Sequence, residues 1–316
     1  MRSIEVRERR ARLGIRHRLA ARARTDDDIA AVVRSVVVLH ATDPASVVLS
    51  ALTRMAHPDP ARVERALYED RIVVRMLGMR RTLWTAPIDA APIVQSSSTL
   101  AVAANERRKL EKLVEDAGLA SPPGPWIDRV EQAALDAVEQ LGEAAATELT
   151  PLVTELASRL TLAAGTTYET TAGLSSRVLF LLAADGHLVR ARPKGRWTSG
   201  QHRWTSMTRW LGAPLVELDP AEARVQWQAR AWYLGGHKAQ VFDTNGNAGP
   251  TIWADGRIVG GWAQRKDGEV VTRLLEDLGR DQTAQVDAAA AQLQILLGDL
   301  RVSPRFPTPI DRELSQ

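Results

Sequence analysis

Apolar residues recur at helical spacing through the first part of the chain. From Ile29 to Val37 they fall at i, i+3, i+4, i+7 and i+8, which predicts an amphipathic helix. A polar break at residues 40–43 follows this helix, and a second helix is predicted over residues 44–55. A third, shorter helix is expected over residues 61–68. The pattern therefore predicts three helices in close succession.

Two short runs of β-branched and aromatic residues come next. Residues 72–74 and 82–85 are predicted to form strands joined by Leu77-Gly78-Met79. No acid occurs between Asp70 and Asp89, whereas four arginines do: Arg71, Arg75, Arg80 and Arg81. Three helices followed by a basic hairpin are the outline of a winged helix, a DNA-binding relative of the helix-turn-helix.

The same outline recurs after a helical stretch over residues 88–118. The proline-rich segment Ala120-Ser121-Pro122-Pro123-Gly124-Pro125 is the clearest linker in the chain. Helices are predicted over residues 126–141 and 142–149, and the second can extend over residues 152–160. Residues 174–185 fit a recognition helix that ends at Gly186.

A second wing and a strand-rich module complete the pattern. Strands over residues 187–192 and 196–198 are expected to flank a wing tip at Pro193-Lys194-Gly195. Farther along, Asp255-Gly256 and Lys266-Asp267-Gly268 are hairpin signals, and residues 281–297 form an amphipathic helical pattern. We therefore predict an α+β chain with tandem winged helices in three parts: an N-terminal arm and winged helix 1 (1–120), winged helix 2 (121–216) and a β-rich C-terminal module with a terminal helix (217–316).

Composition excludes several classes of site. The 316 residues include no cysteine, which excludes disulfides, thiol catalysis and cysteine-bound zinc. No histidine pair has metal-binding spacing, and no phosphate-loop or dinucleotide-binding motif occurs. No apolar run is long enough to span a membrane, and the arginine-rich N-terminus is not a secretory signal. We expect no metal or other cofactor, no membrane association, a cytoplasmic location and a monomer.

The distribution of charge says more than the net charge of +3. No acid occurs from Gly186 through Val216, a window that contains basic residues and three tryptophans: Arg190, Arg192, Lys194, Arg196, Arg203, Arg209, Trp197, Trp204 and Trp210. Basic residues interleaved with aromatics suit phosphate neutralisation and base stacking. A solvated strand face over a tryptophan-containing core is the alternative. The arginines of residues 1–24 fit either a phosphate-contacting arm or a solvated helix face.

Several motifs carry a resemblance to a known family. They are His40-Ala41-Thr42-Asp43-Pro44, Met79-Arg80-Arg81-Thr82-Leu83-Trp84, the segment 241–250, Gly260-Gly261-Trp262-Ala263-Gln264-Arg265 and the tail 301–306. Together they resemble the tandem winged-helix DNA glycosylases of the AlkZ/YcaQ type. The resemblance covers nearly the whole chain. Its members usually carry three winged helices, and the short segment 217–232 indicates that the third is missing or severely reduced here.

The resemblance implies where chemistry would occur. The glycosylases carry Gln-apolar-Gln or Gln-apolar-Asp where this chain has His40-Ala41-Thr42. His40 could accept a proton from water, Thr42 could hold that water, and Asp43 could orient the imidazole or cap the helix that Pro44 begins. A helix junction without catalysis is the other interpretation of this stretch. The predicted DNA contacts are Arg54, Arg75, Arg80, Arg81, Arg177, Arg192, Lys194, Arg196, Trp197 and Arg203.

Two functions of different classes fit these features. The first is a monofunctional DNA glycosylase that removes bulky N7-alkylated purines or acts on crosslinks in double-stranded DNA. The second is a non-catalytic, DNA-binding or regulatory winged-helix protein. N7-alkylated purines already carry positive charge and leave easily, so a polar residue that orients water can suffice.

Overall fold

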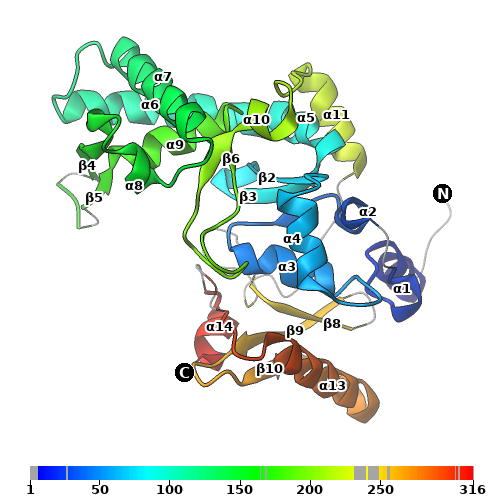
Figure 1. Cartoon of the computed structure of the whole chain (residues 1–316). Helices are drawn as coiled ribbons and strands as arrows, with labels where there is room; N and C mark the ends of the chain where they lie inside the picture. Colours follow the sequence, from blue (N-terminus) through cyan, green and yellow to red (C-terminus); the bar gives the residue numbers. More distant parts are fainter. Residues whose placement is uncertain are drawn as a thin grey trace. The chain divides into compact units, whose positions relative to one another are not determined.

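The computed structural model describes residues 6–25, 28–163, 165–167, 169–230, 240, 249–254, 257–302, 304 and 307–315 (Figure 1). The chain divides into two compact units. The central unit comprises residues 37–41 and 61–231, and the terminal unit comprises residues 1–36, 42–60 and 232–316. The segment that contains His40 thus enters the central unit from the terminal unit and leaves it again after Ala41.

A three-stranded antiparallel sheet lies in the central unit. Its order is β1 (Leu39–His40), β3 (Leu83–Pro87) and β2 (Val73–Leu77), with His40 and Met76 both opposite Trp84. The hairpin β2–β3 confirms the two predicted strands, and its tip is a short 3-10 helix, η2 (Met79–Arg81). Residues 39–40, which precede the second predicted helix in the sequence, therefore pair with the hairpin that follows the third.

The first predicted helix is shorter than its apolar spacing indicates. Helix α2 (Ile29–Arg34) ends before the valine run, and Val37 has a φ of 73°. Consecutive β-branched residues favour extended backbone, and Leu39–His40 pairs with β3 as a strand. The next two helices are confirmed as α3 (Pro44–Leu52) and α4 (Pro60–Tyr68).

Helices make up most of the remaining central unit. The predicted stretch 88–118 consists of η3 (Ile88–Ala90), α5 (Ala91–Val94), the π-helix η4 (Gln95–Thr99) and α6 (Leu100–Asp116). Helix α7 (Pro123–Leu141) begins inside the predicted linker, because proline is favourable in a first helical turn. Helices α6, α7 and α9 (Leu174–Ala184) pack together, as Figure 1 shows.

The second helical pattern differs from its prediction between its second and third helices. After α8 (Ala146–Leu149) and η5 (Thr154–Ala157) the chain forms a hairpin, β4 (Arg159–Leu162) with β5 (Thr170–Gly173), where a helical extension was expected. Alternating residues in β4, of which only Leu160 is buried, explain the strand. Helix α9 occupies the predicted recognition-helix range, and Gly186 follows it with a φ of 85°.

The second wing is longer than predicted. Strand β6 (Leu188–Arg190) pairs with β7 (Trp204–Ser206), and backbone hydrogen bonds extend the pairing to Lys194 and Gln201. The expected partner strand at residues 196–198 is therefore wrong. It lies in the tip, where Trp197 is only 7% exposed. Helices α10 (Met207–Leu211) and α11 (Pro220–Arg230) follow this wing.

One hydrophobic core serves both predicted winged helices. It combines residues of the first sheet and α5 with residues of the second wing and α10: Val38, Val74, Met76, Ala86, Ala91, Val94, Val189, Ala191, Met207 and Trp210. The predicted boundary at residues 121–125 consequently falls inside one compact unit. Shared burial of this kind fixes the two hairpins within the same unit.

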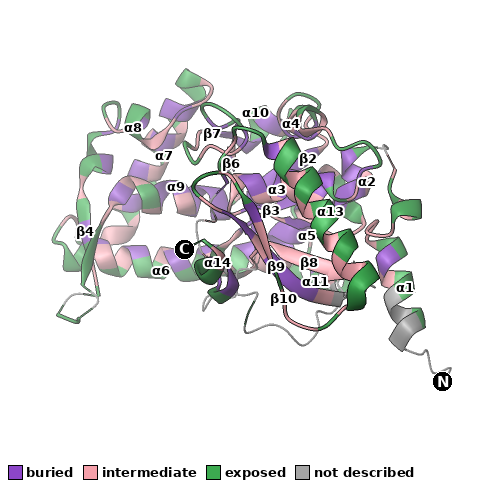
Figure 2. Cartoon of the chain, turned by 90° about the horizontal axis from the view of Figure 1, so that it is seen from below, coloured by how far each residue is buried: buried purple, intermediate pink, exposed green. Residues whose placement is uncertain are grey.

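The terminal unit contains the predicted C-terminal sheet. Strands β8 (Thr251–Ala254), β9 (Arg257–Gln264) and β10 (Val270–Leu274) are antiparallel in that order, as the hairpin signals indicate. Helix α13 (Gly279–Leu297) contacts β10 and is largely exposed in Figure 2. The same unit includes α1 (Val6–Arg16), η1 (Ala21–Ala23), α2 and α3.

A short terminal helix was not predicted within the proline-rich tail. Helix α14 (Pro309–Leu314) begins with Thr308, whose hydroxyl caps it, while the Asp311 carboxylate accepts a hydrogen bond from the Thr308 N–H at 2.8 Å. The sequence contains this signal as Thr-Pro-x-Asp. Residues 231–239 and 241–248 lie outside the described residues, so the reduced third winged helix and the motif at 241–250 stay predictions.

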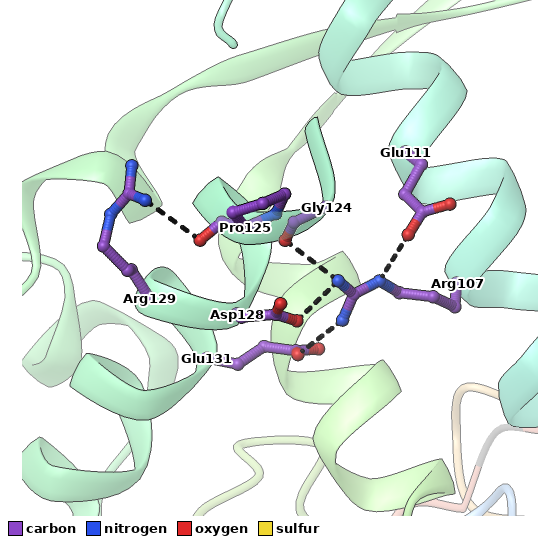
Figure 3. Close-up of polar contacts among 7 residues, drawn as sticks. All are labelled: Arg107, Glu111, Gly124, Pro125, Asp128, Arg129 and Glu131. Carbon is purple, nitrogen blue, oxygen red and sulfur yellow. Dashed lines mark hydrogen bonds and ion pairs between the residues drawn. The ribbon is translucent and has the colours of Figure 1, made fainter. Parts of the chain in front are cut away.

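An ion-pair network joins α6 to α7 in the central unit (Figure 3). The Arg107 guanidinium donates to Glu111 at 2.9 Å, to Glu131 at 3.0 Å and to Asp128 at 2.6 Å, and also to the carbonyl oxygen of Gly124 at 3.0 Å. One arginine thus serves three carboxylates. Glu131 is the least exposed of these acids, at 13% of its side chain, and its Oε1 is buried with no hydrogen-bond partner.

Burial raises the pKa of Glu131 to about 7, with Asp185 and Asp128 adding to the effect and Arg107 opposing it. Because the folded pKa lies above the usual value, protonation of Glu131 stabilises the folded protein. This stabilisation is complete below about pH 4.5 and is lost as pH rises through about 7. Wild type should therefore lose roughly 2 kcal/mol of unfolding free energy between pH 5 and pH 8 that Glu131→Gln does not lose. Urea unfolding at both pH values would check this, and parallel pH profiles would contradict it.

Candidate active site and nucleic-acid interface

The imidazole of His40 is held against the indole of Trp84. The two rings meet edge to face, with centroids 5.2 Å apart and planes at 88°. The Trp84 indole N–H donates to the Met79 carbonyl at 3.4 Å. Gly78 allows this packing, because a Cβ there would lie 2.9 Å from Trp84 Cδ1. His40 is half-buried and is thus fixed by the hairpin that follows the predicted helices.

Both backbone groups of Ala41 are hydrogen-bonded within the central unit. Its N–H donates to the carbonyl of Leu83 at 2.8 Å, and its carbonyl accepts from Arg75 Nη2 at 2.9 Å. Arg75 is only 2% exposed, because it lies in β2 with its side chain under the sheet. Arg75 is therefore covered in this structure, and we leave it out of the DNA contacts proposed below.

Asp43 caps helix α3. Its carboxylate accepts a hydrogen bond from the Ala45 N–H at 2.9 Å, and its backbone carbonyl accepts from the Ser46 hydroxyl at 2.7 Å. Pro44 occupies the first turn, as predicted. The cap gives Asp43 a structural role at the start of α3. Thr42 directly precedes this cap in the sequence.

Arg54, another predicted DNA contact, is turned toward its own helix. Its Nη1 donates to the Ser50 carbonyl at 2.6 Å, and its Nε is buried with no hydrogen-bond partner. Burial lowers the pKa of Arg54 to about 10. This position suits a helix C-terminus, where cations are favourable, and we do not include Arg54 among the proposed DNA contacts. Of Arg80 only the backbone, in η2, is described.

Arg81 and Arg177 lie around one buried acid. Glu106, 6% exposed, pairs with Arg81 at 2.8 Å and with Lys109 at 2.8 Å. The Arg81 guanidinium also lies 5.2 Å from the Phe180 ring. Burial lowers the pKa of Arg177, with the charge of Arg81 adding to this effect and that of Glu106 opposing it. The structure therefore brings these two predicted residues together, with Glu106 balancing part of their charge.

The predicted basic DNA contacts in the second wing are of two kinds, arginines that pair with acids and exposed basic side chains that pair with none of the described residues. Arg192 pairs with Glu69 at 2.9 Å and Arg203 pairs with the Glu143 carboxylate at 3.3 Å, so both contact acids from outside the acid-free window. Within the described residues the side chains of Lys194 and Arg196 form no hydrogen bond or ion pair, and both are exposed. The buried Trp197 supports the core interpretation for this tryptophan.

Comparisons with known proteins gave a family match and a structural match. The family model described as DNA glycosylase AlkZ-like matches residues 33–227 and 223–295. The chain belongs to the AlkZ-like DNA glycosylase family. Among solved structures, it is similar to the Streptomyces sahachiroi DNA glycosylase AlkZ, with a TM-score of 0.64 and 18% sequence identity over 96% of this chain and 100% of that chain. A comparison with curated proteins found no match.

Membership of the AlkZ-like family confirms the resemblance and the α+β fold class. No helix that the structure describes is long and apolar enough to cross a membrane. In the described part of the chain, no three histidine, aspartate or glutamate side chains come together as a metal site would require.

Two residues that contact predicted arginines, Tyr68 and Glu106, could not be singled out from the sequence. Tyr68 lies between Arg75 and Arg192: its hydroxyl is 3.4 Å from Arg75 Nη1, and its ring lies 5.3 Å from the Arg192 guanidinium. Glu106 holds Arg81. Neither has a sequence signal, since Tyr68 simply ends a helix and Glu106 begins an ordinary mixed-charge stretch.

Proposed function

We propose that this chain is a monofunctional DNA glycosylase that hydrolyses the N-glycosidic bond of N7-alkylated purines in double-stranded DNA. The family match, which includes the His40 segment, is the observation that carries the proposal. The ordered imidazole of His40 beside Trp84 supports it. We further propose that the protein acts as a cytoplasmic monomer and needs no metal.

The reaction is a substitution by water at C1′ of the sugar. The water oxygen bonds to C1′ while the C1′–N9 bond breaks, and its electron pair neutralises the positive charge of the N7-alkylated base. A water proton passes to the neutral imidazole of His40, and the Thr42 hydroxyl orients the water as a hydrogen-bond partner. Because the departing base is already cationic, the reaction needs no acid to protonate it.

DNA would be held mainly by phosphate contacts. The exposed side chains of Lys194 and Arg196 lie at the tip of the second wing, where a duplex backbone can reach them. Arg81, Arg177, Arg192 and Arg203 would add positive charge from their partly balanced positions. Contacts of this kind position a protein on DNA without reading its sequence, which suits a search for lesions.

Replacing Lys194 and Arg196 together with glutamine should weaken DNA binding for all sequences. Two lost phosphate contacts should reduce the slope of log K against log salt by roughly two units. Fluorescence anisotropy with a labelled duplex over a range of salt concentrations would measure this. The matched control is Arg108→Gln with Lys112→Gln on α6, which changes the net charge equally. Equal affinity and slope in wild type and the wing variant would show that this wing faces away from DNA.

The proposed activity is tested by incubating the protein with a duplex that contains one N7-methylguanine and scoring abasic sites. Excision above the spontaneous rate is the expected result. Tight duplex binding without excision would instead favour the non-catalytic DNA-binding function.

A further inference from the structure

We propose that Arg75 is a positioning residue that holds the His40–Thr42 segment in its reactive conformation. The inference rests on the proposed excision activity and adds a residue outside the segment itself. Arg75 lies in β2, two strands away from β1 in the sheet order. Its single long side chain joins the hairpin to the backbone of the residue between the two proposed catalytic side chains.

The register of the sheet explains how Arg75 reaches Ala41. Arg75 pairs with Thr85 in β3, and Thr85 pairs with Leu39 in β1, so these three residues lie in one row and share a face. Neighbouring strands are roughly 4.8 Å apart, so only a long side chain can cross β3. The Arg75 guanidinium does so and donates to the Ala41 carbonyl at 2.9 Å.

Hydrogen bonds to Ala41 control the directions of both flanking side chains. The Ala41 N–H belongs to the planar peptide that joins it to His40, and the Ala41 carbonyl belongs to the peptide that joins it to Thr42. Leu83 fixes the first peptide and Arg75 fixes the second. Loss of the Arg75 contact would free the peptide that orients Thr42, while the ring contact with Trp84 would still hold His40.

Stability alone does not account for this arginine. Its guanidinium is buried, and within the described residues no carboxylate forms an ion pair with it. Arg75 Nε and Thr85 Oγ1 are both buried with no hydrogen-bond partner. A buried charge with an unmet donor is costly, and apolar residues of similar volume are often as stable or more so. A cation kept here despite this cost indicates a requirement of the site.

Tyr68 holds the other side of the guanidinium. Its hydroxyl lies 3.4 Å from Arg75 Nη1, and its ring packs edge to face with Trp210 at 6.3 Å between centroids. The aromatic pair belongs to the core that supports the second wing. The Arg75 guanidinium therefore contacts both Tyr68 and the Ala41 carbonyl, which restricts the rotation of its long side chain.

The test compares Arg75→Met, Arg75→Lys and a control, Arg71→Met. Arg71 precedes the same strand and donates to two carbonyls, those of Arg209 and Trp210, away from His40. We expect Arg75→Met to slow single-turnover excision of N7-methylguanine about tenfold or more, with unchanged duplex Kd and an unchanged or higher Tm. Arg75→Lys should recover part of the rate, and Arg71→Met should keep the wild-type rate.

Hydrogen–deuterium exchange of residues 39–43 in the free protein supplies an independent readout. In Arg75→Met the Thr42 amide, which belongs to the peptide that Arg75 holds, should exchange at least several-fold faster than in wild type, and in Arg71→Met it should not. Wild-type exchange in Arg75→Met would overturn the proposal, as would a wild-type excision rate. If wild type itself does not excise the base, the proposed function fails while the exchange experiment still decides whether Arg75 holds the segment. Should Arg75→Met not fold, Arg75→Lys decides: two different guanidinium nitrogens contact Ala41 and Tyr68, and the shorter lysine has only one nitrogen, so excision should still be slower than in wild type, and a wild-type rate would overturn the proposal.

Discussion

His40→Ala should lower the single-turnover rate of N7-methylguanine excision about a hundredfold or more, as expected for loss of a general base. The imidazole is the group of the segment that can accept a proton near neutral pH. Duplex affinity should change little, because the exposed basic side chains of the wing lie elsewhere along the chain. A quenched-flow or manual time course with excess enzyme would measure the rate.

Related variants separate the possible roles of the imidazole. His40→Gln restores the residue type that the resemblance implies for the glycosylases, and Gln can orient water without taking its proton. If His40 acts as a base, the wild-type rate should rise with pH as the imidazole loses its proton and then level off. The rate of the Gln variant should be flat over that range.

Two further changes complete this set of variants. Thr42→Val should cost less than His40→Ala, since the hydroxyl only orients water. His57→Ala, which removes an exposed histidine in the turn before α4, is the matched control. Full excision by His40→Ala would end the catalytic assignment of this residue and leave the family assignment unaffected.

Arg107→Ala should destabilise the central unit by about 2 kcal/mol, less than loss of one partner from a fully buried ion pair, because Arg107, Glu111 and Asp128 are partly exposed. The variant leaves Glu111, Asp128 and Glu131 without their shared cation (Figure 3). It also frees the Gly124 carbonyl in the first turn of α7. Urea unfolding of both proteins at the same pH would measure the change in free energy.

The neighbouring arginine provides the control for this prediction. Arg108 is exposed on the same helix, so Arg108→Ala should change the unfolding free energy by no more than about 0.5 kcal/mol. Adding Glu131→Gln to Arg107→Ala should recover part of the loss, because it removes a buried carboxyl group that has lost its cation. Equal stability of Arg107→Ala and wild type would show that the network contributes nothing to the packing of α6 on α7.

Local patterns were sufficient for most elements of this fold. The Pro44 helix with its Asp43 cap, both C-terminal hairpins and α9 depend on residues adjacent in sequence, and the sequence predicts them. Strand β1 and the hairpin β4–β5 depend on pairing partners farther along the chain. Helical spacing from Ile29 to Val37 gave no sign that the chain leaves the helix after Arg34 to pair with β3.

The candidate site stays a prediction from the sequence, and its contacts could not be predicted in the same way. The motif at His40 could be found from sequence, and so could the basic character of both wings. The sequence did not show which basic residues are exposed, because Arg75 and Lys194 both lie in acid-free windows. Their difference arises from register and from acids such as Glu69 and Glu106, which the fold brings from distant segments.

The most direct measurement is the formation of abasic sites in a duplex containing a single N7-methylguanine, followed over time with wild type and His40→Ala at equal concentration. The proposed glycosylase function predicts rapid excision by wild type and about a hundredfold slower excision by the variant, with equal duplex binding. Tight binding by both proteins with no excision above the spontaneous rate in either would contradict it.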